Sequence, residues 1–145
     1  MIKMTEATRS APPAKVYLPH SIENDFRDYK EYIADTRNSK AIQNLIAWSL
    51  ENGSPGHYAE SAIQSKTVIS DLKPYTVRIS RDMHVAVVRH AASNGGKNYH
   101  GYLDLFCHAL HVFSTNKILF EKGGISKDSI SNSYNEDQLR YELNP

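Results

Sequence analysis

The chain has 145 residues, of which 40% are hydrophobic and 23% charged, a composition typical of one small folded domain with extensions. Its 17 Lys and Arg against 16 Asp and Glu give a formal net charge of +1, which excludes a strongly basic nucleic-acid coat over the whole chain. The apolar runs are too short to predict a membrane span, the N-terminus has no apolar leader, and the single Cys107 excludes an intramolecular disulfide, so we expect a cytoplasmic protein.

The familiar sequence patterns of nucleotide-binding and metal-dependent enzymes are absent. The chain contains no GxxxxGK[ST], GxGxxG, HExxH or CxxC. A hydrolase would pair a nucleophile such as Cys107 with a histidine, but the flanking residues give no support for that pairing. We therefore expect neither an enzyme nor a bound cofactor.

Charge is unevenly distributed along the chain. Residues 73–119 contain six basic and two acidic side chains, a formal charge of +4. Residues 21–72 contain five basic and eight acidic side chains, and residues 120–145 contain three and five. This pattern is typical of a chain whose middle part binds an anionic partner, although ordinary scatter gives similar patterns.

The first 72 residues predict an arm followed by a helical region. Residues 1–20 contain Ala11-Pro12-Pro13-Ala14 and show no apolar period, so they predict a flexible arm. Within residues 21–72, apolar side chains recur at helical spacing from Ile22 to Ile33 and from Ile42 to Leu50, and a weaker helix is predicted from His57 to about Ile69. No internal repeat is apparent.

The hydrophobic period changes at Lys73. Residues 75–80 alternate apolar and polar side chains, the period of a half-buried strand. Ser80 then caps a helix that Asn94-Gly95-Gly96 ends, and a longer helix is predicted over residues 98–116. The Gly, Ser and Asn content of residues 120–145 predicts a mostly disordered tail.

A lone strand in a mainly helical chain lacks a partner for its backbone groups. The simplest remedy is a homodimer in which two copies pair this strand in an intermolecular antiparallel ribbon, covered by four helices. We expect the buried core of that dimer to contain Tyr75, Val77, Ile79, Val87, Tyr102, Phe106 and Leu110.

Residues 73–115, with the strand Tyr75-Thr76-Val77-Arg78-Ile79-Ser80 and the two helices after it, resemble the ribbon-helix-helix superfamily of MetJ/Arc-type DNA-binding proteins. The resemblance implies a domain over 73–119 whose ribbon enters the major groove. It makes Thr76 and Arg78 the base-reading side chains, and the phosphate contacts fall on Lys73, Arg81, Lys97 and Asn98.

The chain departs from the family pattern at three positions. Pro74 stands where a third polar reader is expected, and Lys97-Asn98 replaces a hydroxyl residue at the start of the second helix. Gly101 stands where an acidic residue is usual. At these positions the outer reader contact passes to Lys73 or is lost, and a lysine charge replaces a hydroxyl in the phosphate contact.

Four potential metal ligands lie on one face of the last predicted helix: His100, Asp104, Cys107 and His111. They spread over three turns, so they cannot all reach one ion. A polar helix face with a small buried cysteine is the simpler interpretation, and we expect no metal.

The function predicted from these features is sequence-specific binding of double-stranded DNA by a homodimeric transcriptional regulator, of a kind frequent on plasmids and phages. Several dimers on tandem half-sites are expected from the resemblance, and residues 21–72 would offer a surface to RNA polymerase or another protein. A relaxosome accessory protein and an antitoxin would share the same module. The alternative of a different class is a helical protein–protein adaptor that uses residues 73–119 only for dimerisation.

Overall fold

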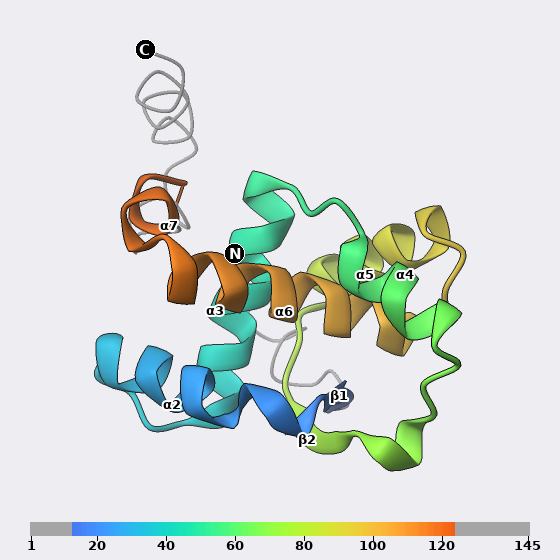
Figure 1. Ribbon diagram of the computed structural model, residues 1–145, viewed down its shortest axis with the longest axis horizontal. Coiled ribbons are helices and arrows are strands. Elements are labelled where there is room, and N and C mark those ends of the chain that lie inside the picture. The colour runs from blue at the N-terminus through green and yellow to red at the C-terminus, as the bar shows by residue number, and fades with distance from the viewer. Residues whose placement is uncertain (1–12, 124–145) are drawn as a thin grey trace.

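The computed structural model describes residues 13–123, which form a mainly helical fold with one small sheet (Figure 1). The first part contains β1 (Ala14–Leu18), a 3-10 turn η1 (His20–Ile22), α2 (Glu23–Tyr32) and α3 (Asn38–Asn52). A connecting part contains α4 (His57–Gln64) and η2 (Ile69–Asp71). The last part contains β2 (Lys73–Val77), α5 (Arg81–Ser93), α6 (Asn98–Thr115) and α7 (Lys117–Gly123).

Helix α6 is the centre of the fold. It is buried along most of its length and contacts α3, α4, α5, α7, α2 and β1 (Figure 1). Leu105, Phe106 and Leu110 have almost no exposed area, and one continuous core joins residues from β1 to α7. The predicted regions 21–72 and 73–119 therefore share a single hydrophobic core.

The strand predicted over residues 75–80 is present as β2, which begins two residues earlier and ends at Val77, and its partner lies in the same chain. β1 pairs with β2 antiparallel, with Val16 opposite Tyr75 and Lys15 opposite Thr76. Val16 and Leu18 have no exposed area, so alternation along β1 turns these two side chains into the core. This pairing corrects the expectation of an intermolecular ribbon, because β2 needs no second copy.

The flexible arm expected over residues 1–20 is wrong for residues 14–18, which form β1. Residues 1–12 of that arm lie outside the described residues. The tail expected from residue 120 is helical in α7 up to Gly123, and its remainder also lies outside the described part of the chain.

Two strand–helix–helix units make up the fold: β1, α2 and α3 form the first, and β2, α5 and α6 form the second. α3 lies against β2 and α6 lies against β1, so each strand packs on the second helix of the other unit. α3 and α6 also pack on each other. The order of one strand followed by two helices therefore occurs twice among the described residues.

Several positions of the two units correspond to each other, although α2 has 10 residues and α5 has 13. Val16 and Leu18 of β1 correspond to Val77 and Ile79, and all four are buried. α3 begins at Asn38 and α6 at Asn98, each after a basic residue at the N-cap. Lys15 and Thr76 lie opposite each other in the antiparallel register. A two-fold axis that relates β1 to β2 therefore lies between these two residues.

All seven residues predicted to lie in a dimer core are buried. They fill the interface between the two units of one chain, with side chains of β1, α2 and α3 as their neighbours. The prediction of burial is thus confirmed, whereas the second copy is not needed to explain it.

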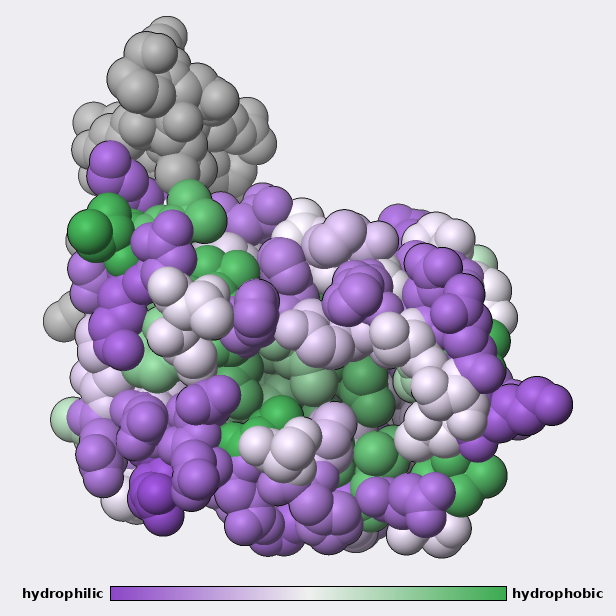
Figure 2. Space-filling view, viewed as in Figure 1, coloured by the Kyte–Doolittle hydropathy of each residue, from purple (hydrophilic) through white to green (hydrophobic). Residues whose placement is uncertain are grey.

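Helix α7 lies at the far end of the molecule from the ribbon (Figure 1). Trp48 of α3 stacks on Phe120 with ring centroids 5.0 Å apart and donates a hydrogen bond to the Phe120 carbonyl oxygen. Ile118 and Leu119 remain exposed on its outer side, where Figure 2 shows hydrophobic atoms over α7.

The internal ribbon predicts the effect of a charge placed on β1. Val16→Asp should lower the free energy of unfolding by about 3–5 kcal/mol, because it buries an unpaired carboxylate. Lys15→Asp is the matched control, since the same carboxylate would stand on the exposed face of the same strand. Chemical denaturation followed by circular dichroism measures both, and equal effects would contradict the assigned faces.

The same arrangement predicts that stability does not depend on protein concentration. A strand pair supplied by one chain forms by an intramolecular step, so the denaturation midpoint should stay constant over a hundredfold range of concentration. A midpoint that rises with concentration would show that a second copy completes the fold.

Candidate nucleic-acid interface

The outer face of the ribbon carries polar and aromatic side chains from both strands. Lys15 and Tyr17 of β1 alternate with the buried Val16 and Leu18 and so face outward. Pro74 and Thr76 of β2 and Arg78 just after it are exposed on the same face. At the centre the Lys15 Nζ donates a hydrogen bond of 3.1 Å to the Thr76 Oγ1 across the strands.

Each end of this face is held by the second helix of one unit. The Arg78 backbone N–H donates to the Ser39 Oγ of α3 at 3.3 Å, and the Gln43 side-chain amide donates to the Arg78 carbonyl oxygen. At the related position of β1, Tyr17 meets Tyr99 of α6 edge to face, with ring centroids 6.2 Å apart. The starts of α3 and α6 therefore flank the ribbon.

The first turn of α6 contains two of the predicted phosphate contacts. Lys97 and Asn98 are both exposed, as a phosphate contact requires. The Lys97 backbone N–H donates to the His100 Nδ1 at 2.9 Å, so this N–H is already used within the protein. Burial, with a smaller contribution from the Lys97 charge, lowers the pKa of His100, which keeps the imidazole neutral and able to accept this bond. The His100 backbone N–H donates to the Lys97 carbonyl oxygen at 2.9 Å, so the N–H groups of Asn98 and Tyr99 are those that helix geometry leaves for an external acceptor.

The related start of α3 is electrostatically different. Arg37 precedes the helix, and its guanidinium makes two hydrogen bonds to the Asp35 carboxylate, at 3.0 and 2.7 Å. The Arg37 backbone N–H also donates to that carboxylate. These hydrogen bonds lower the pKa of Asp35 to about 2, so the pair stays ionised and its charges cancel.

The structure directs one of the other two predicted phosphate contacts, Lys73, away from the outer face. Lys73 shares the alternation of Tyr75 and Val77, and its Nζ lies 3.3 Å from a carboxylate oxygen of Glu23 in α2. Arg81 is exposed at the first residue of α5, next to the Ser80 cap, whose Oγ accepts the Met83 N–H. Thr76 and Arg78 thus share a face, whereas Lys73 points toward α2.

The sequence patterns did not place Lys15, Tyr17 and Arg37 on the ribbon or beside it. The signal was present as Lys15-Val16-Tyr17-Leu18, which alternates polar and apolar side chains as Thr76-Val77-Arg78-Ile79 does. It is only five residues long in the structure and follows Pro12-Pro13, which favours an extended arm equally well.

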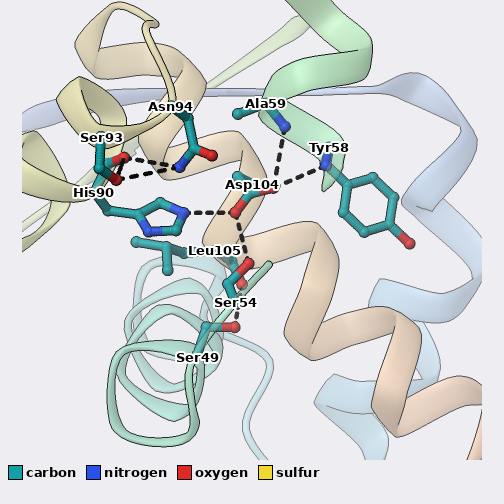
Figure 3. Close-up of polar contacts among 9 residues, drawn as sticks. All are labelled: Ser49, Ser54, Tyr58, Ala59, His90, Ser93, Asn94, Asp104 and Leu105. Atoms are coloured by element: carbon teal, nitrogen blue, oxygen red, sulfur yellow. Dashed lines mark hydrogen bonds and ion pairs between the residues drawn. The ribbon is translucent and has the colours of Figure 1, made fainter. Parts of the chain in front are cut away.

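A second polar cluster surrounds the fully buried Asp104 of α6 (Figure 3). Its carboxylate accepts the backbone N–H groups of Tyr58 and Ala59 at 2.8 and 3.0 Å, which caps the start of α4. The Ser54 hydroxyl and the His90 Nε2 each lie 2.6 Å from its other oxygen. Asp104 therefore ties the connection between the two units to α6 and α5.

This cluster has the residue types of a hydrolytic triad but not its order. In such a triad the imidazole lies between the hydroxyl and the carboxylate, so that it can take the hydroxyl proton. Here the carboxylate lies between Ser54 and His90, and both are bonded to it directly. The arrangement holds the structure together and has no activated nucleophile.

Cys107 lies buried in α6, a helix that also carries several histidines. Burial, assisted by the Asp104 charge, raises the pKa of the Cys107 thiol to about 12, so the thiol stays protonated. Among the described residues, no three His, Cys, Asp or Glu side chains gather in a way that could hold a metal ion.

Comparisons of the chain with protein-family models, curated proteins and solved structures found no match. No helix in the described part of the chain is long and apolar enough to cross a membrane. The function proposed below therefore rests on the residues and their geometry.

The Asp104 cluster predicts an acid-sensitive fold. Burial favours a higher pKa for this carboxyl, but the hydrogen bonds from His90, Ser54 and Ala59 outweigh burial and lower its pKa. The stabilisation is therefore complete above the unfolded pKa of about 3.9 and is lost as pH falls through the lower folded value.

Asp104→Asn should cost about 1–3 kcal/mol at pH 7, because the ionised acceptor of four hydrogen bonds is lost. The difference in unfolding free energy between wild type and variant should shrink as pH falls below about 4. Denaturation at several pH values measures this difference, and a constant difference would contradict the assignment.

Proposed function

We propose that the protein binds double-stranded DNA by placing the β1–β2 ribbon in the major groove. The observation that carries the proposal is the outer face of the ribbon, where Lys15, Thr76 and Arg78 are exposed and the buried Val16, Leu18 and Val77 lie on the opposite face. A two-stranded ribbon fits the width of the major groove, and alternation turns every second side chain toward the bases.

The proposed roles follow from side-chain chemistry. Arg78 is suited to a bidentate contact with guanine, and Thr76 to a hydroxyl contact or to the thymine methyl group. Lys15 adds a donor at the centre of the ribbon, where its bond to Thr76 fixes its direction. These three side chains would read base edges.

The start of α6 is proposed to hold the DNA backbone. Lys97 supplies a positive charge at a helix N-terminus, where the helix dipole favours phosphate. The contact between Tyr17 and Tyr99 holds this helix start in a fixed position relative to the ribbon. The ribbon and the helix start would therefore contact the DNA in one shared register. Contacts of this kind position the protein without reading sequence.

The resemblance of the second unit to the ribbon-helix-helix superfamily supports the same proposal. The first unit repeats its order of strand and two helices, so both units fit the pattern. A role in transcription regulation is the function class in which we place this DNA binding.

Selection from a library of random DNA duplexes tests the proposal directly. The full-length protein should enrich a defined site, and its affinity should fall as salt rises, because phosphate contacts release counterions. No enrichment at low or high salt would refute DNA recognition and leave the ribbon a structural element.

Arg78→Ala should weaken binding to the selected site by about 1–3 kcal/mol and relax the preference at one base pair. Lys122→Ala is the control, because it removes an equal charge from an exposed position on α7, far from the ribbon (Figure 1). Fluorescence anisotropy with labelled duplexes measures both variants, and equal losses would contradict base reading by Arg78.

Lys97→Ala should weaken binding to all duplexes by a similar factor. Since one phosphate contact is lost, the slope of log K against log salt should fall by about 1. Titrations at four salt concentrations give the slope for wild type and variant. An unchanged slope would remove Lys97 from the interface.

A further inference from the structure

We infer that one chain alone reads a DNA site whose two halves differ in sequence. The inference rests on the proposed function, and it goes further by naming the symmetry of the site and the number of chains on it. The order of one strand and two helices occurs twice in the fold, and the two units place different side chains at corresponding positions.

One chain supplies both strands of the ribbon and both flanking helices. β1 pairs with β2, α3 lies against β2 and α6 against β1. The ribbon is therefore complete without a second copy. Binding by a single chain needs no prior dimerisation, so occupancy should follow a simple one-site curve down to low protein concentration.

The two-fold relation makes the positions equivalent, but the side chains at them differ. Lys15 and Thr76 share the central position, and Tyr17 corresponds to Arg78 at the next outward position. A lysine and an arginine donate hydrogen bonds to acceptors such as those of guanine, whereas a threonine also packs on a thymine methyl group. A tyrosine offers a ring and one hydroxyl. The two halves of the ribbon thus present different chemistry to the two half-sites.

The two helix starts that flank the ribbon also differ, in their net charge. At the start of α3 the Arg37 guanidinium is bonded to the Asp35 carboxylate, which cancels its charge. At the start of α6, no acidic side chain among residues 13–123 lies within ion-pair distance of Lys97. The half-site beside α6 should therefore hold its phosphates more strongly than the half-site beside α3.

These differences oppose the symmetry rule for homodimers. A homodimer presents the same side chains twice, so its operator is a palindrome that mirrors the two-fold axis of the protein. Here the backbone follows an approximate two-fold axis and the reading side chains do not. A palindrome would satisfy one half of the ribbon and mismatch the other.

The first experiment determines the site and the stoichiometry together. The full-length protein is used to select sites from random duplexes. Sedimentation velocity then gives the mass of its complex with the enriched duplex. We expect a motif without inverted symmetry and one chain on each duplex. An inverted repeat, or two chains on one minimal site, would overturn the inference while leaving DNA binding intact; no enrichment at all would refute the proposed function and the inference with it.

The second experiment restores symmetry to the ribbon by substitution. Lys15→Thr combined with Tyr17→Arg gives β1 the outward side chains that β2 carries, and Pro13 already matches Pro74. This double variant should select an inverted repeat of the half-site that β2 reads in the wild-type protein. The wild-type motif selected unchanged would overturn the inference.

The reverse exchange is the matched control. Thr76→Lys combined with Arg78→Tyr replaces two exposed side chains and should select an inverted repeat of the other half-site. Thermal denaturation identifies which variants keep the fold, and either folded pair is sufficient for the comparison. If both folded pairs select the same motif, the two strands do not read separate half-sites and the inference is wrong.

Discussion

The pairing of β1 with β2 is the constraint on which the rest of the structure depends. Neither strand can satisfy its backbone groups alone, and each brings two apolar side chains that must leave water. Pairing them inside one chain forces α3 and α6 to meet beneath the ribbon, because each helix must cover the strand of the other unit. The core, the outer face and the positions of both helix starts follow from that crossing.

The connection between the units makes this pairing efficient. Residues 53–72 must lead from the end of α3 back to β2, and Asp104 holds their middle part by capping α4 and bonding Ser54. A pinned connection keeps the two strands at a high effective concentration, so the ribbon forms without a search for a second molecule. Asp104 thus favours formation of the ribbon by holding this connection, although it takes no part in the proposed contact with DNA.

The sequence predicted the second unit well, because its strand alternates, Ser80 caps its first helix and two glycines end that helix. The first unit was not recognised as similar to the second, because corresponding core positions share only their apolar character. Leu18 corresponds to Ile79, and Phe26 corresponds to Val87. Long-range contacts were equally beyond sequence patterns. In the sequence, Asp104 is a single polar residue on a predicted helix. Its neighbours along the chain do not indicate that its hydrogen-bond partners are residues 54, 58 and 90.

A single-chain ribbon permits contacts that a symmetric dimer forbids. At its centre a homodimer would place lysine opposite lysine, where two positive charges repel, or threonine opposite threonine. The chain instead places Lys15 opposite Thr76, and the ammonium donates to the hydroxyl at 3.1 Å. The bond orders a long side chain in the middle of the outer face, so that less rotamer entropy remains to be lost in the proposed contact with DNA. Pairing two different strands within one chain therefore gives each half of the ribbon its own chemistry while both halves keep one common core.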